Sequence, residues 1–233
     1  MKLSIILPCF NESKNLPLIL ERFNNAIKRS DIEVVIVENG SQDNSQEILD
    51  DLLPRYNFAR AIIVNENKGY GHGIISGLLE ANGEFIGYTH ADMQTDPADV
   101  IKALEIAENQ TYPDNSYVKG LRKGRPFFDE IFTKGMSFFE TFYLGTKLWD
   151  INAQPNIFHR SFFEDIKKMC PNDFSLDLYL LYIAQKKKLN VVRFDVTFPE
   201  RVHGKSSWNK GLASRWKFIK RTVDFSIKLK KNL

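Results

Sequence analysis

A short segment near the middle of the chain combines three kinds of side chain that bind metal ions or phosphates. Residues 89–97 read THADMQTDP, which places the imidazole of His90, the carboxylate of Asp92 and the amide of Gln94 close together. Such groups can hold a hard divalent cation, and the cation can in turn hold a diphosphate. The alternative is a solvated loop that does no more than begin a helix.

The residues on either side of this segment indicate where it points. The apolar run Phe85–Tyr88 predicts a buried strand, whereas Asp96 and Pro97 are typical of the N-cap and first position of a helix. The segment is therefore expected at the carboxyl end of a strand, where open α/β sheets bind their ligands.

Apolar and amphipathic segments alternate along the first half of the chain. This alternation predicts βαβ crossovers and an α/β fold, with a mainly parallel sheet flanked by helices. The expected strands are 3–8, 33–37, 60–64, 84–89, 116–119 and 191–198, and the expected helical segments are 16–27, 48–53, 74–79, a helix from 97, 127–148, 162–169 and 175–188. We expect one domain over 1–210, followed by a tail at 211–233.

The composition favours a globular protein of the cytoplasm. Hydrophobic residues make up 43% of the 233 residues, and the two cysteines, Cys9 and Cys170, indicate neither a disulfide framework nor a zinc site. The apolar run at the amino terminus is too short for a signal peptide. No stretch reaches the roughly 18 uncharged apolar residues expected of a membrane span. We therefore expect a cytoplasmic protein that can still lie peripherally on the inner face of a membrane.

Positive charge is concentrated in the tail, where Asp224 is the only acidic residue after Lys205. Apolar residues recur there at helical spacing and predict a basic amphipathic helix; they are Leu212, Trp216, Ile219, Val223 and Ile227. Such a helix suits an anionic membrane surface, although it can equally pack its apolar stripe on the protein itself. No base-reading module accompanies the charge, so no nucleic-acid partner is expected.

Polar residues follow four of the expected strands, and parallel strands would bring all four clusters to one edge of the sheet. We interpret them as the wall of a pocket. Gly69, Gly71 and Gly73 belong to the third cluster and allow a close approach to a ligand. A dinucleotide site would place its glycines after the first strand with the spacing GxGxxG, which argues against a nicotinamide cofactor here.

In this order the motifs resemble those of the family-2 glycosyltransferases, which have the GT-A fold. The motifs are ILPCFNE at 6–12, VENGSQD at 37–43, NKG at 67–69, GEFI at 83–86, HADMQTDP at 90–97, GLR at 120–122, DINAQP at 150–155 and RVHGKS at 201–206. The chain is most similar in kind to dolichol- or polyprenyl-phosphate sugar synthases and to bacterial surface-polysaccharide glycosyltransferases.

The resemblance implies a donor site and a metal site. The residues expected to bind the nucleotide sugar are Pro8, Phe10, Glu12, Glu38, Asn39, Lys68, Gly69, His90, Ala91, Asp92 and Arg122. Asp92, with Gln94 and His90 beside it, is expected to hold a divalent cation, either manganese or magnesium. His90 stands where the family has an aspartate, and imidazole is a better ligand for manganese than for magnesium.

The resemblance also implies residues for the transfer step, namely Asp92, Asp150, Asp177 and Arg201. A hydroxyl acceptor needs a general base, for which Asp150 and Asp177 are the candidates, whereas a lipid phosphate needs none. Asp177 can equally serve to stabilise the start of its helix. Arg125 is equally well explained as a surface arginine. Residues expected to contact the acceptor or a phosphate are Lys134, Gln154, His203, Lys205 and Ser206.

These observations predict an inverting hexosyltransferase that moves a sugar from a nucleotide-diphosphate donor to a lipid-linked or cell-surface glycan. A polyprenyl-phosphate glycosyl synthase with a lipid phosphate as acceptor is the alternative. A non-catalytic protein that binds nucleotide sugars is a second alternative. A nucleotidyltransferase would require a glycine-rich loop with arginine and lysine after the first strand, where this chain has PCFNE.

Overall fold

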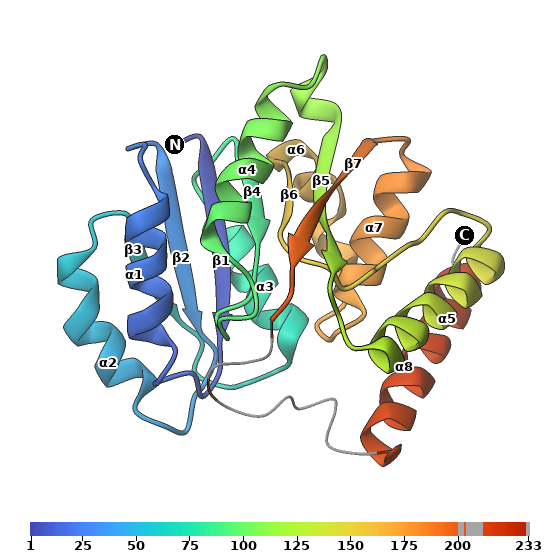
Figure 1. The fold of residues 1–233 in the computed structure, drawn as a ribbon, viewed down its shortest axis with the longest axis horizontal. Coiled ribbons are helices and arrows are strands. Elements are labelled where there is room, and N and C mark those ends of the chain that lie inside the picture. Colours follow the sequence, from blue (N-terminus) through green and yellow to red (C-terminus); the bar gives the residue numbers. More distant parts are fainter. Residues whose placement is uncertain (200–202, 204–211, 232–233) are drawn as a thin grey trace.

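The structure is a computed structural model that describes residues 1–199, 203 and 212–231, with side chains in the last segment described from Trp216 onward. A mixed sheet forms its centre (Figure 1). The described strands are β1 (Leu3–Cys9), β2 (Ile32–Glu38), β3 (Ala59–Ile63), β4 (Phe85–Tyr88), β5 (Ser116–Lys123), β6 (Asn156–His159) and β7 (Asn190–Thr197). They are arranged in the order β3-β2-β1-β4-β6-β5-β7.

Most neighbouring strands in this sheet are parallel, as the alternating pattern predicts. β1 pairs in parallel with β2 and with β4, β2 pairs with β3, and β5 pairs with β7. All six expected strands are present. The sequence did not reveal β6, which is only four residues long and runs antiparallel to both β4 and β5. So short a run carries no readable periodicity.

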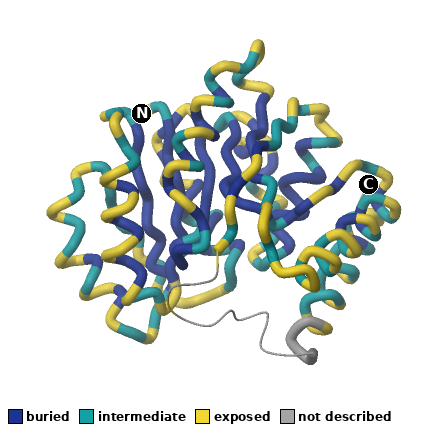
Figure 2. The backbone as a smooth tube through the Cα atoms, in the orientation of Figure 1, coloured by how far each residue is buried: buried dark blue, intermediate teal, exposed yellow. Residues whose placement is uncertain are grey.

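Helices cover both faces of the sheet. They are α1 (Leu16–Ala26), α2 (Ser45–Leu52), α3 (Tyr70–Leu79), α4 (Pro97–Glu108), α5 (Phe127–Leu144), α6 (Arg160–Ile166), α7 (Leu176–Lys186) and α8 (Leu212–Lys231), with short 3-10 turns at Leu53–Arg55, Pro113–Asn115 and Lys167–Met169. α1, α2 and α4 bury apolar side chains against one face, whereas α3, α6 and α7 bury theirs against the other. Figure 2 shows the strands buried between these two layers.

The helix predicted to begin at Pro97 does so. The side chain of Asp96 accepts a hydrogen bond from the backbone N–H of Ala98 at 2.9 Å, and Pro97 occupies the first turn of α4. This cap satisfies a backbone donor at the helix start and ends the polar segment that follows β4 at a defined point.

The basic tail forms α8, which lies beside α5 at the edge of the fold (Figure 1). Ser226 is buried and its Oγ donates a hydrogen bond to Glu140 Oε2 at 2.6 Å. Phe225 and Leu229 pack against the core clusters next to it. The packed face is therefore not the predicted apolar stripe, since Trp216 of that stripe is 68% exposed. Among the described residues, no helix is long and apolar enough to cross a membrane.

Candidate active site

A cavity of about 1020 Å³ opens at the carboxyl ends of β1 and β4. The strand order reverses between these two strands, and open α/β sheets bind ligands at such a switch point. Nine of the residues predicted to bind a nucleotide sugar line this cavity, together with Gln94; the nine are Pro8, Phe10, Glu12, Asn39, Gly69, His90, Ala91, Asp92 and Arg122. The structure thus brings most of the predicted donor site together.

Two residues predicted for the donor site do not line the cavity. Lys68 is exposed and its ammonium group lies 4.0 Å from a carboxylate oxygen of Glu66. Glu38 is buried, and its carboxylate accepts hydrogen bonds from the backbone N–H groups of Gly40 and Ser41 at 3.2 and 2.6 Å. Glu38 therefore closes the turn after β2, where Gly40 has a φ of +70°.

Asn39 is buried in the cavity wall and joins two of the loops that form it. Its Nδ2 donates to the carbonyl oxygen of Gly69 at 3.2 Å, whereas its Oδ1 has no hydrogen-bond partner among the described residues. Buried polar atoms in folded proteins are nearly always hydrogen-bonded. A ligand that brings an N–H donor to this wall would satisfy Asn39.

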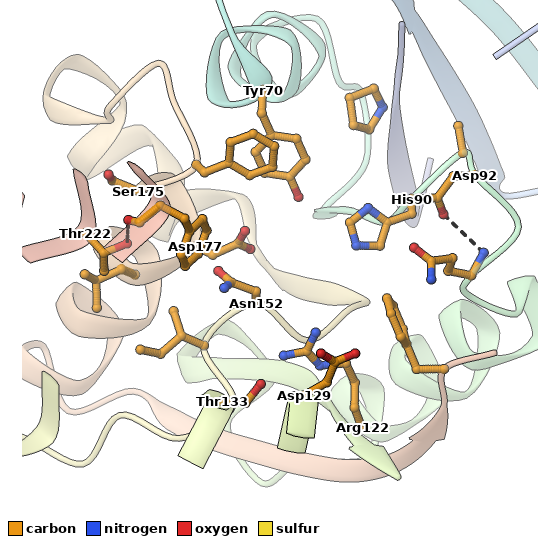
Figure 3. A pocket seen from close by; sticks show the side chains of 18 of the residues that line it. Tyr70, His90, Asp92, Arg122, Asp129, Thr133, Asn152, Ser175, Asp177 and Thr222 are labelled. Carbon is orange, nitrogen blue, oxygen red and sulfur yellow. Dashed lines mark hydrogen bonds between the residues drawn. The ribbon is translucent and has the colours of Figure 1, made fainter. Parts of the chain in front are cut away.

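The segment after β4 presents its polar side chains to the same cavity. Asp92 is buried, and its Oδ1 accepts a hydrogen bond from the backbone N–H of Gln94 at 3.1 Å. Met93 between them has a φ of +66°, a left-handed conformation that is uncommon for residues other than glycine and is often found at functional sites. The centroid of the His90 ring lies 6.4 Å from that of Tyr70 and 6.2 Å from that of Phe198. Figure 3 shows His90 beside Asp92 in the cavity.

These side chains can hold a divalent cation only together with other ligands. In the part of the chain that the structure describes, no group of three or more His, Cys, Asp or Glu residues is placed to coordinate a metal ion. Asp92 offers one carboxylate, with the imidazole of His90 and the amide of Gln94 beside it. This set fits a cation that takes its remaining ligands from water and from the phosphates of a substrate, as Mg²⁺ commonly does.

Arg122 and Asp150 form a buried ion pair that the sequence did not reveal. Arg122 Nε donates to Asp150 Oδ1 at 2.9 Å, its Nη2 donates to the same oxygen, and its backbone N–H donates to Oδ2 at 2.8 Å. Burial alone would raise the pKa of Asp150, but the attraction of Arg122 outweighs it and lowers the pKa. Asp150 does not line the cavity. Both of its oxygens are engaged by Arg122.

Arg125, for which the sequence left a phosphate contact and a surface position equally open, does line the cavity. Its Nη1 donates to Thr133 Oγ1 at 2.6 Å, and its guanidinium lies 5.8 Å from the ring centroid of Phe198. The guanidinium of Arg122 lies 5.3 Å from the same ring. Burial, followed by repulsion from Arg122, lowers the pKa of Arg125. The only sequence signal was its spacing of three residues from Arg122.

Asp177 also lines the cavity, at the start of α7, and is buried. Its Oδ1 accepts hydrogen bonds from the hydroxyl of Tyr88 at 2.8 Å and from Nε2 of Gln154 at 3.1 Å. Gln154, predicted to meet the acceptor, instead lies behind the cavity wall. Its Nε2 also donates to the hydroxyl of Tyr70 at 3.2 Å. The Gln154 amide therefore positions two side chains of the wall, those of Asp177 and Tyr70.

The hydrogen bonds continue from Gln154 to a buried lysine. Asn156 Nδ2 donates to Gln154 Oε1 at 2.6 Å, and Lys119 Nζ donates to Asn156 Oδ1 at 2.6 Å. Burial lowers the pKa of Lys119 to about 7, although the negative charge of Asp177 opposes this shift. Burial raises the pKa of Asp177, and the positive charge of Lys119 opposes that shift. A lysine on β5 was not among the predicted site residues.

The remaining residues predicted for the acceptor, and Arg201 predicted for the transfer step, are not in the cavity wall or lie outside the described residues. Lys134 is exposed and forms an ion pair with Glu130 one turn earlier on α5, with an N–O distance of 2.6 Å. His203 is exposed. Arg201, Lys205 and Ser206 lie outside the described residues. The structure therefore does not bring Lys134 into the cavity wall.

Comparison with known proteins identifies relatives of this chain. A family model described as glycosyl transferase family 2 matches residues 4–167. A dolichol-phosphate mannosyltransferase of Pyrococcus furiosus is 28% identical over 88% of this chain and 59% of its own length. An undecaprenyl-phosphate 4-deoxy-4-formamido-L-arabinose transferase of Photorhabdus laumondii is 28% identical over 89% of this chain and 63% of its own length. The chain thus spans about three fifths of the length of these curated relatives.

Solved structures share the fold. Glucosyl-3-phosphoglycerate synthase from Mycobacterium tuberculosis, in complex with Mn²⁺ and uridine diphosphate, superposes with a TM-score of 0.68 at 15% identity and covers 92% of this chain and 76% of its own. The mannosyltransferase PcManGT from Pyrobaculum calidifontis, in complex with GDP-mannose and Mn²⁺, has a TM-score of 0.67 at 17% identity, over 89% of this chain and 59% of its own. At this identity the likeness concerns the fold.

Proposed function

The chain belongs to glycosyl transferase family 2, and from this premise we propose that it moves a sugar from a nucleotide-diphosphate donor to a lipid-linked acceptor. One observation carries the proposal. The buried carboxylate of Asp92 opens into the same switch-point cavity as Asn39, whose buried Oδ1 has no partner among the described residues. A nucleotide with a diphosphate would use both groups.

A divalent cation is part of this proposal. Asp92, Gln94 and His90 would hold it, and when bound it would offset the charge that the leaving diphosphate gains. Similar folds have been crystallised with Mn²⁺ or Mg²⁺ together with uridine diphosphate, and with Mn²⁺ and GDP-mannose. Inversion at the anomeric carbon follows from the family resemblance.

The acceptor proposed here is a polyprenyl phosphate. Two relatives carry dolichol phosphate or undecaprenyl phosphate in their names. The cavity also has an apolar part near α5 and α8, lined by Phe132, Met136 and Phe218. An isoprenoid chain is apolar and would gain free energy by leaving water for such a wall. Its phosphate is already anionic and needs no general base.

A hydroxyl group of a surface or lipid-linked glycan is the second candidate acceptor, and Asp177 favours it. This carboxylate lines the cavity and accepts hydrogen bonds from Tyr88 and Gln154, which stabilise its ionised form. A positioned carboxylate can remove a proton from a hydroxyl. The two acceptors therefore differ in whether Asp177 acts in the reaction.

We further propose that the protein works on the inner, anionic face of a membrane. α5 carries five large apolar side chains that are each more than half exposed, namely Phe127, Phe128, Ile131, Phe138 and Phe142. Their spacing places them along one side of the helix. A stripe of this size on a surface marks an interaction site. Lys228, Lys230 and Lys231 at the end of α8 bring positive charge to the neighbouring helix.

The test is release of nucleoside diphosphate from a panel of UDP-, GDP-, dTDP- and CDP-sugars, with Mn²⁺, Mg²⁺ or a chelator. Each donor is offered with a short-chain isoprenyl phosphate, with a glycan acceptor or with neither. We expect cation-dependent release that is stimulated by the isoprenyl phosphate and yields a glycosylated lipid. Stimulation by the glycan alone would favour the second candidate. Donor binding without release from any pair would identify a non-catalytic binding protein.

A further inference from the structure

The carboxylate of Asp177 divides its two oxygens between the protein interior and the cavity. Its Oδ1 accepts hydrogen bonds from the Tyr88 hydroxyl at 2.8 Å and from Gln154 Nε2 at 3.1 Å. Within the described part of the chain its Oδ2 accepts no hydrogen bond, and Asp177 lines the cavity. The wall therefore offers one carboxylate oxygen to a ligand as a hydrogen-bond acceptor.

The groups around Asp177 match a ligand that carries hydroxyl groups. Asn152 and Ser175 line the same cavity, and Ser175 Oγ is buried without a hydrogen-bond partner among the described residues. Figure 3 shows both on the same side as Asp177, whereas Asp92 lies on the other side. A sugar hydroxyl can donate to a carboxylate and accept from an amide or a hydroxyl. Because a carboxylate repels a phosphate, this part of the cavity favours a neutral sugar.

The amide of Gln154 can donate to Asp177 in only one of its two orientations. Its Oε1 accepts a hydrogen bond from Asn156 Nδ2 at 2.6 Å, which leaves Nε2 for Asp177 and for the Tyr70 hydroxyl. The reverse orientation would bring Oε1 against the carboxylate oxygen, and two acceptors cannot form a hydrogen bond. The direction of this amide therefore decides whether the Asp177 carboxylate is held in place.

A buried lysine fixes that direction from behind the wall. Lys119 is fully buried, and its Nζ donates to Asn156 Oδ1 and to the carbonyl oxygen of Ala153, both at 2.6 Å. The Tyr117 hydroxyl donates to the same oxygen of Asn156 at 3.0 Å. Because an ammonium group can only donate, Asn156 must turn its Nδ2 toward Gln154. A buried ammonium group bonded to neutral oxygens costs folding free energy, which indicates a role other than stability.

We propose that Lys119 and Asn156 are positioning residues that act through the amide of Gln154. They hold the carboxylate of Asp177 so that its Oδ2 accepts a hydrogen bond from a sugar hydroxyl. This assignment rests on the proposed function. The hydroxyl belongs to the hexose of the nucleotide-sugar donor or to a glycan acceptor, and the chemistry of the contact is the same for both.

Asn156→Asp tests the direction of the amide while keeping the shape of the side chain. A carboxylate at this position pairs with Lys119 and still accepts from the Tyr117 hydroxyl, but it cannot donate to Gln154. The Gln154 amide is then expected to reverse and to turn its Oε1 toward Asp177.

The measurement is titration calorimetry with Mn²⁺ and without acceptor, using the UDP-, GDP-, dTDP- and CDP-sugars and the matching nucleoside diphosphates. Asn156→Asp is expected to weaken nucleotide-sugar binding by about ten- to a hundredfold and to leave nucleoside diphosphate binding unchanged. If nucleotide-sugar binding also stays unchanged but the KM for a glycan acceptor rises by this factor, the hydroxyl belongs to the acceptor.

A control and a compensating variant accompany this test. Asn190→Asp is the control, because Asn190 Nδ2 donates to Gln110 Oε1 at 2.8 Å in an exposed pair of the same kind, at the start of β7. It is expected to bind like the wild type. Asp177→Asn combined with Asn156→Asp can donate its Nδ2 to the reversed Gln154 amide and keep its Oδ1 toward the sugar. This double variant is expected to bind the sugar more tightly than either single variant.

Unchanged nucleotide-sugar binding together with an unchanged acceptor KM in a folded Asn156→Asp protein would overturn the assignment. An equal loss for the nucleoside diphosphate would also overturn it, because the added charge would then be responsible. If Asn156→Asp does not fold, Gln154→Met removes the same donor and is judged by the same outcomes. If Asn156→Asp weakens nucleotide-sugar binding but the wild type transfers the sugar to no acceptor, the proposed function fails and the positioning role stands.

Discussion

Arg122 and Asp150 neutralise each other inside the protein, with side chains only 8% and 6% exposed. Their contact connects the end of β5 to the turn before β6, since Asp150 also accepts the backbone N–H of Arg122 at 2.8 Å. Asp150 itself adopts a left-handed φ of +44°. This pair holds together the side of the cavity that carries Arg125 and α5.

Removing one partner of this pair should destabilise the fold. Asp150→Ala leaves the Arg122 guanidinium buried without its counter-charge, and loss of one partner of a buried pair costs about 3–5 kcal/mol. The midpoint of thermal unfolding should therefore fall by roughly 10 °C. Asp195→Ala, which removes an exposed ion-pair partner of Lys123, is the control and should change the midpoint little. Equal midpoints for the two variants would contradict this role.

Substitution of Asp92 should abolish use of the cation. Asp92→Asn keeps the shape and can still accept the hydrogen bond from Gln94, but it removes the charge on which a cation depends. Release of nucleoside diphosphate is expected to fall by at least about 100-fold, with the thermal midpoint unchanged. Asp96→Asn is the matched control in the same segment, because asparagine also caps helices well. Full turnover by Asp92→Asn would remove the metal assignment.

The pH dependence of turnover should reveal whether Lys119 supports the ionised form of Asp177. Because the positive charge of Lys119 holds down the pKa of Asp177, Lys119→Met should raise that pKa further. If a hydroxyl is the acceptor, the fall in rate at acid pH then moves to higher pH. Rates at pH 6 should drop more than rates at pH 8.5.

A double variant tests the same connection. In an Asp177→Asn background, Lys119→Met should cause no further change in the pH profile, because the titrating group is already absent. A shift that persists in this background would assign the effect to another group. A lipid phosphate acceptor predicts a profile that Asp177→Asn leaves unchanged.

Glu140 should make the packing of α8 on α5 dependent on pH. Burial raises the pKa of Glu140 to about 7, although the hydrogen bond from Ser226 opposes this shift. The pKa of Glu140 in the folded protein thus lies above its unfolded value near 4.5. Protonation of the Glu140 carboxyl therefore stabilises the folded state at low pH. That contribution disappears as the pH rises through about 7. Glu140→Gln should therefore raise the thermal midpoint at pH 8 by several degrees and have little effect at pH 5. A uniform shift at both pH values would contradict this account.

The exposed apolar stripe of α5 should determine binding to membranes. Phe138→Ser combined with Phe142→Ser removes two rings that lie largely in solvent, and each ring gains about 2 kcal/mol when it leaves water. Sedimentation with anionic vesicles should weaken by at least about tenfold. Tyr112→Ser is the control: its ring is equally exposed, but it precedes β5 and so lies at the end of the sheet opposite the cavity. Equal binding by both proteins would contradict the proposal.

A truncation distinguishes the contribution of α8. If the protein shortened before Leu212 binds anionic vesicles as well as the full chain, the basic helix does not contribute and α5 alone carries the contact. Folding of the shortened chain must be checked, because Phe225 and Leu229 pack against the core.

The sequence predicted the sheet, the polar segment after β4 and the helix start at Asp96 because each depends on neighbours in the chain. Period-two and helical patterns, as well as a cap with its helix, are local properties. The ordered motifs also identified the family from the residues alone. The sequence did not predict β6, because four residues are too few for a readable pattern. It did not predict which face of α8 packs on the protein, because the helix has two apolar sides.

The residue types and their order along the chain therefore determined the fold class, the switch-point cavity and the segment that contains Asp92. Only the tertiary structure decided which charges are available in that cavity. Asp150 pairs with Arg122, 28 residues earlier, while Arg125 lines the cavity and Lys134, on the next helix, faces solvent. The free energy of a charge depends on its burial and on the partner beside it. Those partners come from distant parts of the chain, so no local pattern encodes them.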